Sequence, residues 1–202
     1  MNPGTMDAVR QQKLNSLATK HLHVKQMKRL NVYSRLVDIL AFGVPFLYLT
    51  LRLIFKGTIH EKAAEISWDV VAALLFILAI LKLVLRWQER AQEHSRLLGE
   101  NITLVGLADN LLLNQSTATA ETIRYFNLLT ERSEREDRES LGEVSPKDKQ
   151  FAYREGLKES EPGNTAIVCP VCKSSPYQFT PGSCQVCGNT PRVQVSSKNT
   201  SQ

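Results

Sequence analysis

The sequence ISWDVVAALLFILAILKLVLRW, residues 66–87, contains a core of twelve apolar residues without a charge. Trp68 and Trp87 bracket this core and would lie about 28 Å apart on a helix, the spacing of interfacial aromatic belts. Lys82 and Arg86 near its end can both extend toward one membrane surface. The run therefore predicts a helix that spans a bilayer. The alternative is a buried hairpin in a soluble bundle, but the chain has little other apolar material to cover one.

A second apolar run, LVDILAFGVPFLYLTLRLIF, covers residues 36–55. Its twenty residues would extend for roughly 30 Å as a helix, which matches the hydrocarbon thickness of a bilayer. Asp38 and Arg52 lie near its two ends, where a charge can reach the interface, and Pro45 would kink the helix. We expect this run to be the first of two spans, joined to the second through residues 56–65.

A connection this short forces the two spans to run antiparallel, so both ends of the hairpin lie on one side of the membrane. Residues 1–35 carry seven Lys or Arg against one acid, and further arginines follow the second span. The connecting loop has two lysines beside two glutamates. The positive-inside rule therefore places both termini in the cytoplasm, and we expect the protein in the inner (cell) membrane.

The charges within the two runs predict partners across the hairpin. Asp38 would lie near Lys82 and Arg86 at the cytoplasmic end, whereas Arg52 would lie near Asp69 at the opposite end. Ionisable residues in membrane spans are costly and usually find partners. We therefore predict ion pairs between the spans. The alternative is that each side chain extends alone to its nearest headgroup layer.

The segment before the hairpin reads as a basic helix, because helix formers dominate it from about Met6. Leu14 and Leu17 belong to an apolar stripe on this helix. Such a helix is either solvated or lies on the anionic cytoplasmic leaflet, and the two readings are compatible.

The segment after the hairpin also reads as helical, with a break near Asn114–Thr117 and a charged surface over residues 131–140. Ser145, followed by Pro146, has the pattern of a helix cap. The sequence thus predicts a mainly α membrane protein. Its four parts are a basic helix (1–35), the two-span hairpin (36–87), a cytoplasmic helical region (88–159) and a cysteine module with a tail (160–202).

All four cysteines follow the pattern C-x2-C, eleven residues, C-x2-C: Cys169, Cys172, Cys184 and Cys187. Each C-x-x-C can turn two thiolates toward one centre, and two such knuckles complete a tetrahedral four-sulfur site that suits zinc. No secretory signal is visible in residues 1–35, so we expect reduced thiols rather than disulfides. The intervening PYQFT suits a short hairpin, so we predict a small zinc ribbon. Iron in a rubredoxin-like site and a redox dithiol are the alternatives to zinc.

Two hypotheses describe the role of this ribbon. It is either a module that folds because it binds metal, or a recognition surface for a protein or nucleic acid. The chain has a formal net charge of +5, but the ribbon has too few basic residues for a phosphate surface. We therefore favour protein contact or assembly and do not expect nucleic acid as a direct ligand.

The sequence contains no group of residues that is typical of a catalytic site, so we predict that the protein is not an enzyme. No nucleophile–base arrangement or glycine-rich phosphate loop is present, and the four histidines are scattered. His21 and His23 are two residues apart, so a helix does not place them on one face. We expect surface positions for both.

The cysteine spacing resembles the pattern that names the mobilome CxxCx(11)CxxC proteins. Residues of about 10–130 also resemble the SLATT architecture, in which a basic leading helix, a two-span hairpin and a helical segment follow one another. SLATT proteins are regarded as membrane effectors of prokaryotic conflict systems, often paired with a sensor. A minimal hairpin effector does not need a zinc ribbon, and this chain departs from the pattern there.

This resemblance implies an antiphage effector that forms homo-oligomers and perturbs or permeabilises the inner membrane when activated. Its expected partners are the lipid bilayer, further copies of the chain, and a sensor or regulatory protein. The alternative is a membrane-tethered adaptor or sensor whose zinc ribbon recruits a protein or nucleic-acid partner. The two differ in the hairpin, since an anchor tolerates any apolar sequence whereas an effector needs specific polar positions and self-association.

Overall fold

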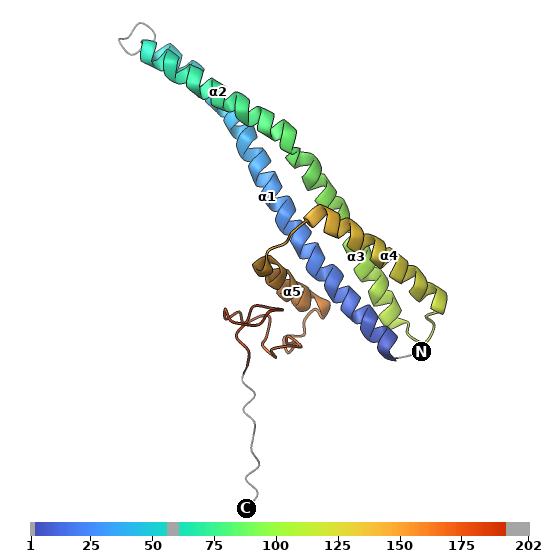
Figure 1. Cartoon of the computed structure of the whole chain (residues 1–202). Helices are drawn as coiled ribbons and strands as arrows, with labels where there is room; N and C mark the ends of the chain where they lie inside the picture. Colours follow the sequence, from blue (N-terminus) through green and yellow to red (C-terminus); the bar gives the residue numbers. More distant parts are fainter. Residues whose placement is uncertain (1–2, 56–60, 193–202) are drawn as a thin grey trace, which may run out of the picture. The chain divides into compact units, whose positions relative to one another are not determined.

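The computed structural model describes residues 3–55 and 61–192, which are mainly helical (Figure 1). Within these ranges no strand forms, and one isolated antiparallel bridge joins Pro181 to Asn189. The expected hairpin strands around PYQFT are therefore not found. The helices are α1 (Pro3–Phe55), α2 (Glu61–Leu85), α3 (Trp87–Leu113), α4 (Ala120–Leu141) and α5 (Pro146–Ser160).

Helix α1 joins two segments that we had expected to be separate, the basic helix and the first apolar run. Pro45 lies inside it and does not end it. A proline removes one backbone hydrogen bond, here to the carbonyl of Ala41, but an apolar helix tolerates this loss. The helix continues from Arg35 into Leu36, because no glycine or proline lies near this boundary to interrupt it.

A single residue separates α2 from α3. Arg86 has a φ of 50°, in the left-handed region that residues other than glycine rarely adopt. The backbone hydrogen bonds continue on both sides, from Arg86 N to Lys82 O and from Arg90 N to Arg86 O. The turn is therefore a one-residue interruption in an otherwise helical path.

The chain divides into two compact units. The bundle unit comprises Met1–Val24 and Ser95–Gln202, and the hairpin unit comprises Lys25–His94. Helices α1 and α3 each contribute to both units.

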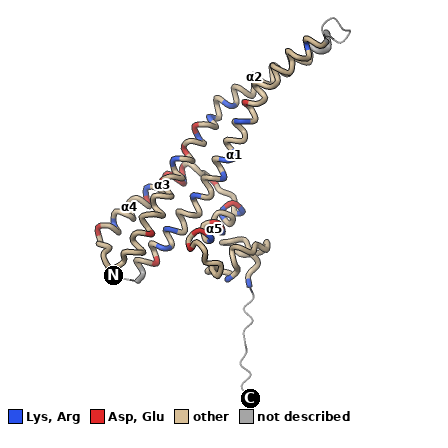
Figure 2. Tube along the Cα trace, turned by 180° about the vertical axis from the view of Figure 1, so that it is seen from behind, with Lys and Arg blue, Asp and Glu red and all other residues tan. Residues whose placement is uncertain are grey.

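The hairpin unit contains two helical segments that are long and apolar enough to cross a membrane. Their most apolar windows have mean hydropathies of 1.8 and 2.5, and at most 6% of either window is buried in the protein. Large apolar side chains such as Phe42 and Leu83 are each 80% exposed. Charges are sparse along α2 and dense along α3 and α4 (Figure 2).

Two aromatic pairs join the helices of the hairpin unit. Tyr48 of α1 stacks on Trp68 of α2, with ring centroids 3.9 Å apart. Tyr33 of α1 lies beside Trp87 of α3, with centroids 6.0 Å apart and the rings tilted by 45°. The two pairs lie about 22 Å apart along α1, from Tyr33 to Tyr48, and about 28 Å apart along the path through α2 to the start of α3, from Trp68 to Trp87.

The bundle unit packs α1, α3 and α4 around a small apolar core. One cluster contains Val9, Leu104, Ala108 and Phe126, all nearly inaccessible to solvent. Leu14 and Leu17 of the expected apolar stripe are also buried in the protein. This part of the stripe therefore packs against other helices and is not available to lie on a leaflet.

Local signals set the starts of α4 and α5, and the break near Asn114–Thr117 and the Ser145 cap were both predicted. The break before α4 follows Leu113, and the Thr119 side chain caps the new helix by accepting a hydrogen bond from Thr122 N. Ser145 caps α5 in the same way by accepting from Asp148 N, with Pro146 at the first helical position.

Helix α5 docks on α1 at a glycine. A Cβ built at Gly156 would lie 2.8 Å from the backbone nitrogen of Ala18 and 3.3 Å from the backbone carbonyl carbon of Leu17. Polar contacts flank this crossing: Lys20 and His21 both reach Glu159, and Lys13 Nζ donates to Ser160 O at 2.9 Å. The two helices can approach this closely only because residue 156 has no side chain.

We predict that Gly156→Ala destabilises the docking of α5, by about 1–3 kcal/mol, because backbone atoms occupy the space that a Cβ needs. Urea unfolding of the full chain in detergent and the protease sensitivity of residues near α5 provide the measurement.

Gly106→Ala is the matched control, because Gly106 also lies within a helix, but a Cβ added there would meet no atom of another element within 4 Å. That change should stabilise the protein by roughly 0.5–1 kcal/mol through helix propensity. Equal effects at the two glycines would contradict the close crossing.

Candidate metal centre

The four cysteines lie together in the bundle unit. Their sulfur atoms are all within 4.8 Å of one another, and those of Cys172 and Cys187 are 3.4 Å apart. A tetrahedral zinc with sulfur ligands at about 2.3 Å places its sulfurs about 3.8 Å apart. All four side chains are buried and none forms a disulfide. The cluster could therefore hold one metal ion.

Both C-x-x-C segments have the same backbone geometry. Each is followed by a residue in the left-handed region, Lys173 with a φ of 59° and Gly188 with a φ of 72°. In each segment, the backbone N–H of this left-handed residue donates to the carbonyl of the first cysteine. The backbone N–H of the first cysteine in turn donates to the carbonyl of the residue that follows the left-handed one. These four bonds are Lys173 N to Cys169 O (2.9 Å), Gly188 N to Cys184 O (2.8 Å), Cys169 N to Ser174 O (2.9 Å) and Cys184 N to Asn189 O (3.1 Å).

The buried side chain of Asn189 links the segment between the two C-x-x-C knuckles to the second knuckle. It is 1% exposed; its Oδ1 accepts from Thr180 N at 3.0 Å and its Nδ2 donates to Ser175 O at 3.0 Å. The backbones of Gly182 and Thr190 come so close that a Cβ at residue 182 would lie 2.3 Å from Thr190 N. These contacts, together with the backbone hydrogen bonds from Thr190 N to Thr180 O and from Gly182 N to Gly188 O at 2.8 Å, hold the module although no regular strand forms among its described residues.

The environment of the thiols favours binding of a cation. Burial opposes ionisation, but hydrogen bonds from the backbone and side chain of Ser174 lower the pKa of Cys172 to about 7. Burial, and then the neighbouring sulfurs, raise the pKa of Cys187. Four thiolates can therefore share this volume only when a bound cation offsets their mutual repulsion.

Helix α5 holds the module through Arg154, which is largely buried. Its Nη1 donates to Cys187 O at 2.5 Å, and its guanidinium carbon lies 3.8 Å from the centre of the Phe179 ring. Burial lowers the pKa of Arg154, and the negative charge of Cys187 opposes this shift. Gln150 adds a weaker bond from its Nε2 to Cys184 O at 3.3 Å.

The module also shares its apolar core with α1 and α5. Leu14 and Leu157 form one buried cluster with the four cysteines, and Tyr153 packs against it. Burial, and then the charges of the cysteines, raise the pKa of Tyr153 to about 12. We expect the module and its tail, residues 160–202, to form a separate part of the chain. Instead, the module is packed onto the helices that precede it.

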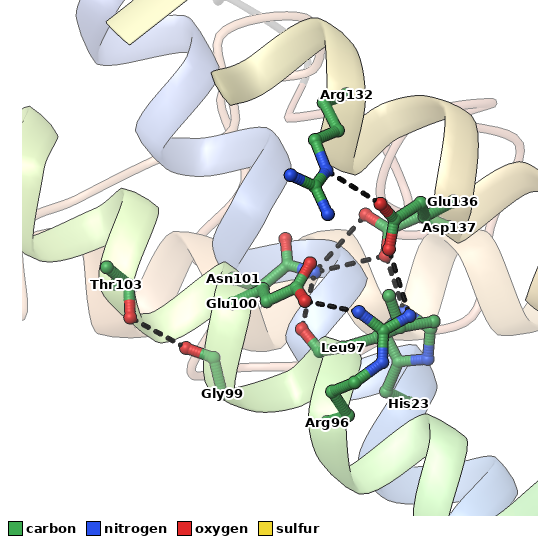
Figure 3. Close-up of polar contacts among 10 residues, drawn as sticks. All are labelled: His23, Arg96, Leu97, Gly99, Glu100, Asn101, Thr103, Arg132, Glu136 and Asp137. Carbon is green, nitrogen blue, oxygen red and sulfur yellow. Dashed lines mark hydrogen bonds and ion pairs between the residues drawn. The ribbon is translucent and has the colours of Figure 1, made fainter.

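A second buried site, made of polar residues, joins the three helices of the bundle unit (Figure 3). His23 of α1 is fully buried, and its Nε2 lies 2.8 Å from Asp137 Oδ1 of α4. Asn101 of α3 donates from its Nδ2 to both oxygens of the same carboxylate at 3.2 Å and to Leu97 O at 3.1 Å. We call these three side chains the polar junction.

A network of ion pairs between α3 and α4 lies beside this junction (Figure 3). Glu136 accepts from Arg132 Nε at 2.9 Å and pairs with Arg96 Nη2 at 2.9 Å, while Arg96 also pairs with Glu100. Hydrogen bonds from Arg132 and then Arg96 lower the pKa of Glu136.

The expected surface position of His23 is wrong, and the expected charged surface over residues 131–140 is wrong at Asp137. The signal was present in the spacing of α4, whose buried residues are Phe126, Thr130, Ser133 and Asp137. Their intervals of four, three and four keep Asp137 in phase with Phe126. The polarity of Asp137 concealed a position that the helical period assigns to the core.

The predicted charges within the apolar runs are brought together at one end only. Lys82 forms an ion pair with Asp38 across the hairpin, and Arg86 pairs instead with Glu89, three residues further along. Within residues 3–55 and 61–192, no ion pair joins Arg52 to Asp69, and both are exposed. Tyr33 and Tyr48, the partners of the two tryptophans, were not anticipated.

Comparison with known proteins identifies a family for this chain but no individual similar protein. The family model described as "Mobilome CxxCx(11)CxxC protein" matches residues 6–190. No curated protein matches the chain, and no solved structure matches it either.

We predict that the full chain, purified under reducing conditions, contains about one metal ion and that Cys172→Ser loses it. The same change should make α5 sensitive to protease, because the cysteines share a core with Leu157. Elemental analysis and limited proteolysis measure the two effects.

Val171→Ser is the matched control, because Val171 lies in the same knuckle but is 65% exposed. It should keep the metal. Metal-free wild-type protein, or a Cys172→Ser variant with full metal content, would show that the cluster is not a metal centre.

For the polar junction, we predict that His23→Leu and Asp137→Leu each destabilise the protein by roughly 1–3 kcal/mol, because each removes a hydrogen-bond partner from a buried polar side chain. The double variant should recover much of that loss. A double-mutant cycle on urea unfolding measures the coupling.

His21→Leu serves as the comparison, because His21 pairs at 3.0 Å with the partly exposed Glu159. Its cost should be under about 1 kcal/mol. Additive effects of the His23 and Asp137 changes would mean that the two side chains are not coupled.

Proposed function

The chain belongs to the family of mobilome CxxCx(11)CxxC proteins, and from this premise we propose that it is a membrane effector of a prokaryotic conflict system. Its hairpin unit spans the inner membrane, both termini are cytoplasmic, and several copies assemble to perturb the bilayer on activation. The order of a basic helix, two spans and further helices supports this through its likeness to the SLATT architecture.

The exposed apolar surface of the hairpin unit supports insertion. Two helices that leave so many large apolar side chains exposed would aggregate in water, whereas lipid covers them. The Tyr33–Trp87 and Tyr48–Trp68 pairs suit the two interfaces, where amphipathic rings concentrate. Their separations of about 22 Å and 28 Å along the two helices approach the hydrocarbon thickness.

The Asp38–Lys82 ion pair is the observation that favours an effector over an inert anchor. Each residue lies five positions inward from its aromatic neighbour, Tyr33 or Trp87, which is about 7.5 Å toward the apolar region. Charges at such a depth are costly, and an anchor has no need of them. Both side chains are partly exposed, so the pair is accessible to further copies of the hairpin.

We further propose that the metal is zinc. Four thiolates in a closed, hydrogen-bonded site match structural zinc, which takes four sulfur ligands. Elemental analysis distinguishes zinc from iron, and an iron-loaded protein would favour the rubredoxin-like alternative.

A second function is supported by exposed apolar side chains of the cysteine module. Val171 and Phe179 are 65% and 50% exposed there, and Tyr177 is 43% exposed. Such side chains suit contact with a protein partner, so a membrane-tethered adaptor is the alternative function. In that case the hairpin would only anchor the module.

The effector function predicts that bacteria expressing the full chain, alone or with the products of its neighbouring genes, lose membrane potential. Asp38→Lys and Lys82→Asp should each reduce this loss strongly, because each leaves two like charges within the hairpin. The double reversal should restore part of it. A potential-sensitive dye measures the effect, and membrane fractionation verifies insertion.

Asp69→Asn is the matched control, because Asp69 is an acid at the other end of the second span and forms no ion pair with any described residue. It should behave like the wild type. If inserted wild-type protein leaves the potential intact, or if the single reversals act like the wild type, the adaptor becomes the better description.

A further inference from the structure

We infer that the Tyr33–Trp87 end of the hairpin unit carries a binding surface for anionic phospholipid headgroups. The surface consists of four basic residues, which we call the basic collar: Lys28, Arg29 and Arg35 on α1 and Arg90 on α3. This inference rests on the proposed insertion of the hairpin and adds the class of lipid that it selects.

The collar has the charge that such a ligand requires. All four side chains are exposed, and none forms an ion pair with another residue in the part of the chain that the structure describes. Of the acids in residues 25–38 and 82–94, Asp38 is held by Lys82 and Glu89 by Arg86. Only Glu93 is left to offset four cations.

The collar also has the right depth. Arg29 and Lys28 lie four and five residues before Tyr33, about 6 and 7.5 Å along α1. Arg90 lies three residues after Trp87, about 4.5 Å along α3. A headgroup layer is about 5–7 Å thick, so these cations reach the phosphates when the aromatic pair marks the edge of the hydrocarbon. Arg35 lies two residues inside that edge and can extend outward.

Contact between Tyr33 and Trp87 brings α1 and α3 together at this level. Cations from two helices therefore lie at the level of one aromatic pair, where guanidinium groups can bind phosphate oxygens while the rings contact the upper acyl chain. Continuity with the apolar hairpin favours a lipid over a nucleic acid as the source of the phosphate.

The opposite end of the hairpin lacks this excess of charge. The sequence from Arg52 to Asp69 contains three basic and three acidic residues. Trp68 lies at that end and Trp87 lies beside the collar, and the chain has no other tryptophan. The two tryptophans can therefore report the lipids at the two ends separately.

The test uses the full chain in phosphatidylcholine vesicles that contain, at equal mole fraction, either brominated phosphatidylglycerol or brominated phosphatidylcholine. The Trp68→Phe variant leaves Trp87 as the reporter, and Trp87→Phe leaves Trp68. We expect brominated phosphatidylglycerol to quench Trp87 about twofold more strongly than brominated phosphatidylcholine, and to quench Trp68 no more strongly. The preference should weaken with added salt.

Replacing Arg29, Arg35 and Arg90 with Gln in the Trp68→Phe background should remove the preference, while quenching by brominated phosphatidylcholine shows that the hairpin remains inserted. Equal quenching of Trp87 by both lipids, or a preference that survives the triple change, would overturn the inference and leave the proposed insertion intact. Displacement of the anionic lipid by duplex DNA would assign the collar to nucleic acid instead. Quenching by neither lipid would overturn both the inference and the insertion.

Discussion

Two helices cannot bury each other's apolar side chains on every face, and this constraint governs the chain from Lys25 to His94. Each helix of a pair covers at most one stripe of its neighbour, so the remaining faces need another covering. In the bundle unit a third helix and α5 provide that covering, and Leu14 and Leu157 are buried. In the hairpin unit no further helix does so among the described residues, and Phe42 and Leu83 are each 80% exposed. The two units therefore need different surroundings even though α1 and α3 run through both.

The bundle unit compensates for a small apolar core with polar interactions that are specific in direction. The carboxylate of Asp137 receives hydrogen bonds from Asn101 and pairs with His23, so one side chain on α4 fixes positions on α3 and α1. Apolar contacts tolerate sliding between helices, whereas a buried carboxylate loses stability with any shift that removes a partner. At the other edge of the unit, Arg154 fixes the cysteine module in a comparable way through Cys187 O.

Local sequence patterns predicted the features that depend on neighbours within a few residues. The apolar runs, the break before α4, the Ser145 cap and the paired C-x-x-C segments are all of this kind. What escaped prediction depends on contacts between distant segments. The burial of His23 requires Asp137, more than a hundred residues away, and the role of Gly156 requires the backbone of Ala18. Tyr33 and Tyr48 were overlooked for the same reason, because their positions gain meaning only when the helices pair.

The shared core of Leu14, Leu157 and the cysteines has a consequence for the order of biosynthesis. Leu14 leaves the ribosome long before the cysteines do; at 5–20 residues per second the delay is on the order of ten seconds or more. During that interval both apolar runs have already been synthesised, while Leu14 on α1 still lacks the cysteines that bury it. The four sulfurs are buried, so a metal ion bound by them would enter before the knuckles close around it. On the proposed function, maturation of each copy would end in the cytoplasm with a metallation step, and a cell short of that metal would accumulate inserted but unfinished chains.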